Sequence, residues 1–199
     1  SGGARMTPDM DAALSAGRAA LLVVDVQDRL AAVMAPDGMS ALCRNVAILC
    51  EAARRFAIPV VVSQQYPSGL GGTVAAVEQA LSTLPPEQLH RFDKIEFSVC
   101  AAPGFAPVEA RLDGRDQWIV TGMETHVCVY QTARALRAGG AAVHVVRDAV
   151  ISRTPQNRDT GLSLIERTGA LLTSTEVVLF DLLQRAGTAD FKALSRLIV

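Results

Sequence analysis

The 199-residue sequence contains no long apolar stretch and no long run of charge of one sign. No segment approaches the roughly 18 uninterrupted apolar residues that a membrane-spanning helix requires. The 19 basic and 20 acidic residues are interspersed, and the formal net charge is −1. A nucleic-acid-binding surface or an anionic membrane would call for a basic cluster. We therefore expect neither nucleic acid nor a membrane as a main partner.

Cysteine and histidine are few, and their spacing is not that of a metal site. There is no C-x-x-C pair, and the histidines are scattered along the chain. Cys43 and Cys50 lie seven residues apart on one face of a predicted helix, so we interpret both as core residues. The pattern favours a reduced intracellular protein over a disulfide-stabilised one. The residues concerned are Cys43, Cys50, Cys100, Cys128, His90, His126 and His144.

The N-terminus lacks the basic, apolar and small segments of a secretion signal, in that order. Instead, Ser1-Gly2-Gly3 precedes Met6, a pattern typical of a tag remnant. We expect a cytoplasmic protein in which residues 1–18 are a tag remnant and lead-in. Residues 19–199 have the length of one domain and show no repeat or linker, so we expect them to form a single domain with its own core.

Apolar runs alternate with amphipathic segments along the whole chain. This alternation indicates an α/β domain, with a parallel sheet covered by helices on both faces in a three-layer α/β/α sandwich. Two stretches, residues 64–72 and 84–105, break the pattern, and the first is rich enough in Gly and Pro to predict a loop. The predicted strands are Ala19–Val26, Pro59–Ser63, Leu89–Asp93, Gln117–Thr121, Ala142–Val146 and Leu171–Thr173; the predicted helices are Met39–Phe56, Thr73–Leu81, Pro107–Leu112, His126–Ala138, Gln156–Thr168 and Thr175–Arg185.

Cys128 is a candidate nucleophile because it opens a predicted helix directly after a predicted strand. Unpaired N–H groups and the positive end of the helix dipole near its sulfur would favour thiolate over thiol. The strand ends at Gly122, and Thr125 is a plausible N-cap of the helix. The alternative is a buried structural cysteine in an apolar turn. Strand-to-helix corners of this kind are where open parallel sheets hold ligands, and this position favours the catalytic interpretation.

Asp25 and Lys94 could supply the other groups that a cysteine nucleophile needs. Asp25 ends the first apolar strand, although an aspartate there can also simply cap a turn. Lys94 follows a later strand between Phe92 and Phe97, although a lone lysine is usually a surface charge. Together with Cys128 they form a plausible unit: the carboxylate takes the thiol proton, the ammonium holds the carboxylate, and the thiolate attacks an electrophilic carbon.

At this point the sequence resembles the isochorismatase-like cysteine hydrolases, over about residues 19 to 183. The resemblance rests on an Asp in a V-V-D-V-Q setting, a Lys between aromatic residues, and G-x-x-T-x-x-C-V at the start of a helix. Within that superfamily it is most similar to the isochorismatase domain-containing proteins, most of which have no defined substrate. The segments that carry this similarity are Gln65-Tyr66-Pro67-Ser68-Gly69-Leu70-Gly71, Glu124-Thr125-His126-Val127-Cys128 and Phe191-Lys192.

The resemblance implies a single α/β domain with a six-stranded, mainly parallel sheet and a catalytic triad of Asp25, Lys94 and Cys128. It also implies a cis peptide bond between Met123 and Glu124. The backbone N–H groups of Glu124 and Cys128 would then form an oxyanion hole. Residues that we expect to line the substrate pocket are Gln27, Tyr66, Leu70, Thr125 and His126.

Alternatives remain for several of these residues. His126 could line the pocket or merely cap a turn, and the glycine-rich loop that follows Tyr66 could contact substrate or a second subunit. Nicotinamidase relatives carry an Asp-x-His metal site after the second strand, where this chain has Ser63-Gln64-Gln65. Amide oxygens are poor replacements for imidazole as ligands of a transition metal, so we predict no metal and no cofactor.

Three functions are compatible with the sequence. The first is a metal-independent cysteine hydrolase that acts on a small amide, an N-carbamoyl compound or a related small molecule. The second is hydrolysis of a vinyl ether of the isochorismate type, which need not acylate the sulfur. The third is a binding or scaffold protein that has kept the fold without activity. In each case the resemblance suggests a homo-oligomer, either a dimer or a larger assembly.

Overall fold

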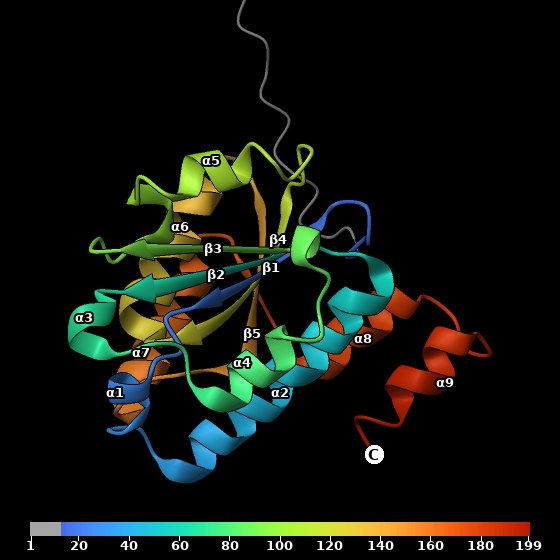
Figure 1. The fold of residues 1–199 in the computed structure, drawn as a ribbon, viewed down its shortest axis with the longest axis horizontal. Helices are drawn as coiled ribbons and strands as arrows, with labels where there is room; N and C mark the ends of the chain where they lie inside the picture. The colour runs from blue at the N-terminus through green and yellow to red at the C-terminus, as the bar shows by residue number, and fades with distance from the viewer. Residues whose placement is uncertain (1–12) are drawn as a thin grey trace, which may run out of the picture.

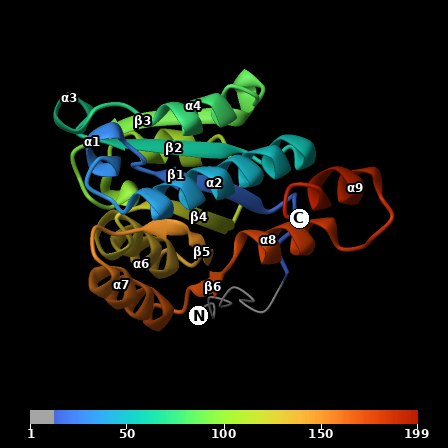
Figure 2. The same ribbon diagram turned by 90° about the horizontal axis from the view of Figure 1, so that it is seen from below.

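A parallel sheet of six strands forms the centre of the structure, and helices cover both of its faces (Figure 1). The computed structural model describes residues 13–199; the predicted tag remnant lies largely outside these residues. The strand order is β3-β2-β1-β4-β5-β6, which Figure 2 shows from top to bottom. Every neighbouring pair is parallel, so the predicted fold class is confirmed. The strands are β1 (Ala19–Val24), β2 (Val60–Gln65), β3 (Leu89–Lys94), β4 (Gln117–Met123), β5 (Ala142–Ile151) and β6 (Leu171–Thr173).

The helices pack on the sheet in two layers, each with its own apolar core. α2, α4 and α8 cover one face, and α5, α6 and α7 cover the other. None of the helices in residues 13–199 has both the length and the apolar character to cross a membrane. The helical segments are α1 (Asp28–Ala31), α2 (Pro36–Phe56), α3 (Pro67–Leu70), α4 (Ala75–Leu81), η1 (Pro86–Gln88), η2 (Val99–Ala101), α5 (Phe105–Glu109), η3 (Thr125–Val129), α6 (Tyr130–Ala138), α7 (Pro155–Arg167), α8 (Thr175–Leu183) and α9 (Ala189–Ser195).

β1 is the central strand that divides the two cores. All six of its residues are buried, and successive side chains point to opposite faces of the sheet. Leu21 and Val23 pack with α2 and α8, whereas Leu22 and Val24 pack with the core beneath α6 and α7. A strand that is covered on both faces must be apolar throughout, which explains the uninterrupted hydrophobic sequence.

The helix ends follow local sequence signals. α2 has Pro36 in its first turn, where a missing N–H costs nothing. α7 and α8 begin after Thr154 and Ser174, and each of these side chains accepts a hydrogen bond, from Asn157 N–H and Val177 N–H respectively, at 3.2 Å. These caps fix where the chain leaves the carboxyl ends of β5 and β6.

Several predicted boundaries differ from the structure. β2 runs two residues beyond its predicted end, through Gln64 and Gln65, because both remain in register with β3 although their side chains are polar. The prediction of an irregular loop over residues 64–72 is therefore wrong in part, and Pro67 also starts the short helix α3. α9 was not predicted; it begins after Thr188, whose hydroxyl caps it at 3.0 Å.

Gly122 allows β4 to approach β1 at the point where the two strands end. Its φ is +116°, and a Cβ placed there would lie 2.0 Å from the carbonyl oxygen of Val24. No side chain fits without moving the backbone of β1. Because Asp25 directly follows Val24, this close approach also fixes the spacing between the two strands that lead to Asp25 and to Cys128.

We predict that Gly122→Ala lowers the free energy of unfolding by about 3 kcal/mol or more, since it adds a backbone clash to an unfavourable φ. Gly140→Ala is the matched control: its φ is +95°, but no heavy atom lies within 4 Å of the added Cβ. The control should lose only about 1 to 2 kcal/mol. Urea unfolding of both variants measures the difference. Equal losses would show that the contact with Val24 is unimportant.

Candidate active site

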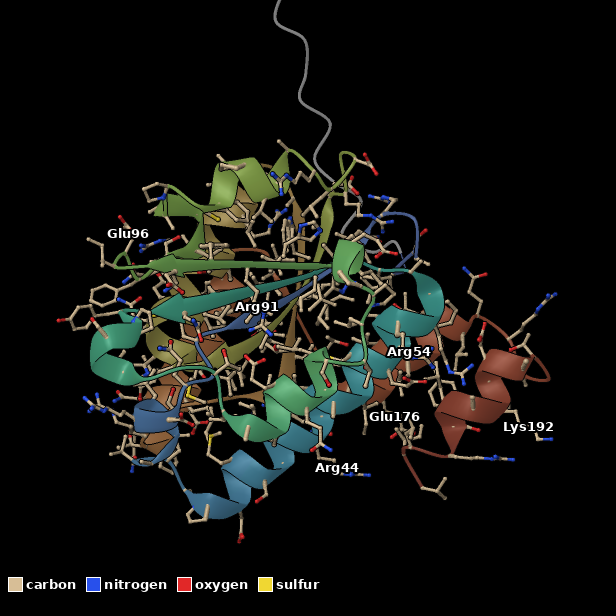
Figure 3. The ribbon with its side chains drawn as sticks, in the orientation of Figure 1. Arg44, Arg54, Arg91, Glu96, Glu176 and Lys192 are labelled. Carbon is tan, nitrogen blue, oxygen red and sulfur yellow. The ribbon has the colours of Figure 1, made fainter. Side chains whose placement is uncertain are left out.

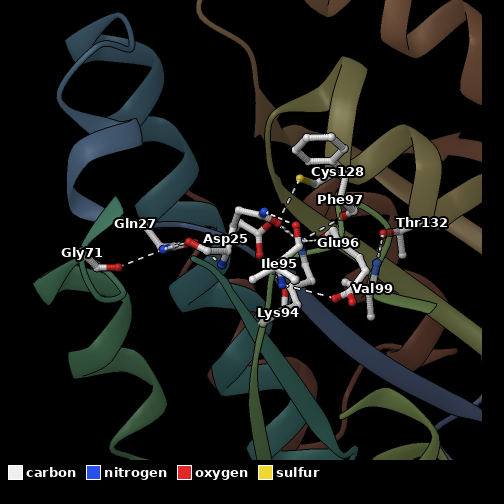
Figure 4. Close-up of polar contacts among 12 residues, drawn as sticks. Asp25, Gln27, Gly71, Lys94, Ile95, Glu96, Phe97, Val99, Cys128 and Thr132 are labelled. Carbon is white, nitrogen blue, oxygen red and sulfur yellow. Dashed lines mark hydrogen bonds and ion pairs between the residues drawn. The ribbon is translucent and has the colours of Figure 1, made fainter. Parts of the chain in front are cut away.

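Three of the predicted site residues meet at the carboxyl edge of the sheet. Asp25 directly follows β1, Lys94 is the last residue of β3, and Cys128 lies in the turn after β4 (Figure 4). β1 lies between β2 and β4 in the sheet, and the chain reverses its direction of strand addition at this position. Such a reversal opens a crevice beyond the strand ends, which is where α/β proteins bind ligands.

Asp25 and Lys94 form a fully buried ion pair. Lys94 Nζ lies 2.7 Å from Asp25 Oδ2, and both side chains have no solvent exposure. The second carboxylate oxygen, Oδ1, accepts a hydrogen bond of 2.8 Å from the hydroxyl of Ser63. A buried pair of this kind is stable only if its remaining polar atoms are also satisfied, and breaking it by removing one partner typically costs about 3 to 5 kcal/mol.

The ammonium group of Lys94 has acceptors on several sides. Besides Asp25, it donates to Gln65 Oε1 at 2.6 Å and to the carbonyl oxygens of Glu96 and Phe97 at 3.0 Å each. The loop after β3 therefore folds back over its own lysine. This network explains how a lysine can be charged and buried at the end of an edge strand.

Gln65 is a site residue that the sequence analysis did not single out. Its side-chain oxygen contacts Lys94 Nζ and also lies 4.0 Å from Cys128 Sγ, while its Nε2 donates to the carbonyl of Ile95 at 2.8 Å. Apart from its place in the segment Gln65–Gly71, which carries the family resemblance, its one sequence signal was its position after the second apolar run. Since β2 was predicted to end at Ser63, that signal placed Gln65 in a loop.

Cys128 lies in a wide turn instead of at an α-helix N-terminus. The segment Thr125–Val129 is one turn of π-helix, and α6 begins only at Tyr130. π-turns at the start of helices are frequent at functional sites. The thiol is 6% exposed, and Figure 4 shows the ring of Phe97 extending toward it. Cys128 is thus almost enclosed, and Gln65 Oε1 lies 4.0 Å from its sulfur.

The pKa of the Cys128 thiol is raised to about 12, so the expectation of a thiolate favoured by the helix dipole is wrong for the free site. Burial is the largest cause, and the negative charge of Asp25 raises the pKa further. Lys94 acts in the opposite direction and lowers it. Because burial and the carboxylate outweigh the ammonium, the resting sulfur is a neutral thiol close to a base.

The residues between β4 and Cys128 are held by contacts from the end of β5. Glu124 Oε1 accepts hydrogen bonds of 3.0 Å from both the N–H and the Nε of Arg153. His126 Nδ1 lies 2.9 Å from Ser152 Oγ, a contact that holds the imidazole ring against the end of β5. The peptide bond between Met123 and Glu124 is cis.

Thr125 does not cap the helix, contrary to our expectation. The hydroxyl of Thr125 is buried and has no hydrogen-bond partner within residues 13–199. Its backbone is pressed against α7, because a Cβ on Gly161 would lie 2.9 Å from Thr125 C and 2.8 Å from His126 Cα. The packing of α7 therefore fixes the main chain that precedes Cys128.

The remaining pocket candidates lie at the edge of the site. Gln27 is fully buried, and its amide group is taken up by backbone: Nε2 donates to Gln65 O and Gly71 O at 2.8 Å each, and Oε1 accepts from Gln65 N–H at 2.6 Å. Tyr66 is exposed, and Leu70 is partly buried in α3. Gln27 thus ties the end of β2 to the glycine-rich loop, while Tyr66 lies on the outer rim.

Among the residues that the structure describes, no three His, Cys, Asp or Glu side chains are grouped so that they could hold a metal ion. Gln64 and Gln65, the last two residues of β2, stand where the nicotinamidase pattern has metal ligands. Gln64 is engaged elsewhere, since its Oε1 accepts from Thr73 N–H at 2.8 Å. A metal-independent site stays a prediction from the sequence.

Comparison with known proteins identifies relatives over most of the chain. The family model described as the isochorismatase domain matches residues 19–177. A secreted isochorismatase effector of Phytophthora sojae is 39% identical over 75% of this chain and 70% of its own length. Isochorismatase domain-containing protein 1 of Danio rerio is 37% identical over 75% of this chain, and the match covers 50% of that relative's length.

Solved structures have the same architecture. A structure of MAR1 ribonuclease from Caenorhabditis elegans has a TM-score of 0.84 and 35% identity, and the match covers 94% of this chain and 92% of that one. YcaC from Pseudomonas aeruginosa, solved with hexane-2,5-diol and covalent acrylamide, has a TM-score of 0.76 and 26% identity, with 94% and 95% covered.

The raised pKa of Cys128 predicts a steep pH dependence of alkylation. Below a pKa of about 12, the thiolate fraction increases tenfold with each pH unit. Iodoacetamide labelling of Cys128, followed by mass spectrometry of its peptide, should therefore accelerate about tenfold per unit between pH 7 and pH 10 without a plateau. A plateau near neutral pH would mean that the thiol is already ionised.

Asp25→Asn should increase the reactivity of Cys128 toward iodoacetamide. The substitution removes a negative charge that raises the thiol pKa and leaves the ammonium of Lys94, which lowers it. At fixed pH the thiolate fraction, and with it the labelling rate, should rise by about fivefold or more. Cys43 in the same sample is the internal control and should not change. Slower labelling of Cys128 in this variant would refute the assigned balance of charges.

Proposed function

Since the chain belongs to the isochorismatase family, we propose that it is a metal-independent cysteine hydrolase of a small amide, N-carbamoyl compound or related molecule. The observation that carries the proposal is the contact of Asp25 with Lys94 beside the nearly enclosed thiol of Cys128. A neutral thiol, a buried carboxylate and a fixed cation are the groups that a nucleophilic displacement at a carbonyl carbon requires.

In the proposed first step, Asp25 removes the proton of Cys128. Without substrate this transfer is unfavourable, because burial holds the pKa of the thiol at about 12. The transfer would accompany bond formation, so that the negative charge moves from the carboxylate through sulfur to the carbonyl oxygen of the substrate. Proton transfer by a positioned group of this kind contributes about 10²- to 10⁴-fold to rate.

The sulfur then adds to the carbonyl carbon and forms a tetrahedral adduct. We assign the stabilisation of its oxyanion to the backbone N–H groups of Glu124 and Cys128. One such donor is worth about 3 kcal/mol in a site that excludes water. The contacts of Glu124 with Arg153 and of α7 with Thr125 support this assignment, because they hold the main chain between the two donors.

Collapse of the adduct breaks the bond to the leaving group, which takes the proton from Asp25 and departs as an amine or ammonia. The acyl group remains on sulfur as a thioester. Water, deprotonated by Asp25, attacks the thioester carbon; the acid product leaves, and the proton returns to Cys128. The sum is one substrate plus one water giving two products, with no redox change.

Lys94 and Gln65 act as positioning residues in this scheme. Lys94 holds Asp25 in place through its 2.7 Å contact, and Gln65 orients Lys94 through its side-chain oxygen. The free hydroxyl of Thr125 is the candidate for a hydrogen bond to the substrate, since it is buried without a partner in the described part of the chain. His126, Tyr66 and Leu70 complete the proposed pocket and its rim.

The YcaC protein of Pseudomonas aeruginosa supports the proposed chemistry, because its structure was solved with covalent acrylamide. Acrylamide is a small electrophilic amide. A reactive nucleophile in a relative with the same fold agrees with a cysteine-based reaction here, although a Michael addition to the alkene is not the hydrolytic step itself.

RNA hydrolysis is a second candidate, favoured by the name of the Caenorhabditis relative, a MAR1 ribonuclease. The four basic side chains labelled in Figure 3 do not form the extended track that RNA would need. The labelled basic side chains in Figure 3 extend from separate elements: Arg44 and Arg54 from α2, Arg91 from β3 and Lys192 from α9. Both Arg54 and Arg91 are paired with glutamates. A backbone-binding track for RNA would concentrate free cations along one groove.

We further propose a cytoplasmic homo-oligomer. The proposed interface includes α8, where Val177 and Phe180 are large apolar residues with 52% and 45% exposure. Side chains of this kind are enriched where subunits meet.

The decisive variant is Cys128→Ala. It should abolish hydrolysis of every active compound in a panel of small amides and N-carbamoyl compounds, while Cys100→Ala, the control, keeps at least half of the wild-type rate. Intact-protein mass spectrometry during turnover should show an acyl adduct, and this adduct should be on Cys128 only. Turnover without an adduct, on a vinyl ether substrate, would favour the isochorismatase-type reaction. No turnover on amides, vinyl ethers or RNA would favour a binding protein.

A further inference from the structure

A hollow separate from the candidate active site lies at the carboxyl end of β5, between the first turns of α2 and α7. Its volume is about 320 Å³. The wall formed by α2 consists of small residues, so the space between the two helices stays open. The residues that matter for its chemistry are Gly38, Arg147, Asp148, Ser152, Arg153 and Arg158.

Three arginines line this hollow, and each retains unused donors. The side chain of Arg147 makes no hydrogen bond or ion pair with any of the residues 13–199. Arg158 uses Nε and Nη2 on the carbonyl oxygens of Val150 and Arg147, which fixes its orientation and leaves Nη1. Arg153 uses Nε on Glu124 and leaves both terminal nitrogens.

The two acidic groups nearby, Asp148 and Glu124, offset two of these three positive charges and leave a net excess of one. Asp148 is the one carboxylate in the lining, and its Oδ1 already accepts hydrogen bonds of 2.9 Å from both the N–H and the hydroxyl of Thr175. Glu124 lies behind Arg153 and balances that single charge. The hollow therefore has an excess of positive charge and several guanidinium N–H groups without acceptors among the described residues.

We propose that this hollow, here called the arginine pocket, binds a phosphate-type oxyanion. Guanidinium groups present paired N–H donors that match the oxygens of phosphate, and they bind such groups more specifically than lysine does. The 320 Å³ space admits an inorganic phosphate or the phosphate end of a small metabolite. The proposal does not depend on the function proposed for Cys128.

The arginine pocket also adjoins the segment before Cys128. Ser152 contacts His126, and Arg153 holds the carboxylate of Glu124, so two lining residues touch that segment directly. An oxyanion that binds the free terminal nitrogens of Arg153 would share this arginine with Glu124. An oxyanion bound in the pocket would thus alter the contacts that hold the main chain of residues 124–126.

The test is a thermal unfolding titration with sodium phosphate, at ionic strength held constant with sodium chloride. A ligand that binds the native state raises the melting temperature in a concentration-dependent way. Wild type should show a saturable rise, and Arg147→Gln should need about tenfold more phosphate, or more, for half of that rise. Arg147 is exposed, so the variant should fold normally. The matched control, Arg167→Gln, removes a charge at the opposite end of α7 and should behave as wild type.

A parallel titration with glycerol 3-phosphate distinguishes a phosphorylated metabolite from inorganic phosphate as the ligand. A half-maximal rise at lower concentration than with inorganic phosphate would identify a phosphorylated metabolite as the ligand, and the reverse order would identify the free ion. The proposal is overturned if Arg147→Gln and Arg167→Gln respond alike, or if phosphate gives wild type no more stabilisation than chloride does.

Discussion

The buried contact between Asp25 and Lys94 is the interaction on which the arrangement of the site depends. It connects the end of β1 to the end of β3 across β2, and it is stable only because Ser63, Gln65 and two loop carbonyls satisfy the remaining atoms. The loop after β3 is folded inward to supply those carbonyls. Sheet order, strand ends and loop conformation are therefore coupled to one pair of charges.

Much of the fold could be predicted from the sequence, because buried parallel strands must be apolar. β1 is recognisable in this way, since all six of its residues are apolar and buried. The least accurate strand end was that of β5, predicted at Val146 but observed at Ile151, because the polar residues Arg147 and Asp148 interrupt its apolar run. β2 ends two residues later than predicted for the same reason, since Gln64 and Gln65 are polar although the backbone continues its pairing. α9 is short and was missed because its cap, Thr188, is a weak signal when no long periodic segment follows.

The candidate site could be predicted in part. Residue type and position at strand ends indicated Asp25, Lys94 and Cys128, and the structure brings these three together. The pKa of Cys128 could not be read from local sequence, because a motif shows neither burial nor the distance to a carboxylate 103 positions away in the chain. Gln65 was not predicted as a site residue for a similar reason, since its role arises from contacts with other strands.

The four acceptors around Lys94 Nζ restrict which groups can transfer protons during turnover. All three N–H groups of this ammonium are engaged, so it has no hydrogen left to donate to a substrate. Under the proposed mechanism, the proton that Cys128 gives to Asp25 leaves with the amine, and a proton from water replaces it on the sulfur through the same carboxylate. The enclosed volume keeps the same overall charge from one intermediate to the next, so turnover would draw only a neutral water molecule from bulk solvent.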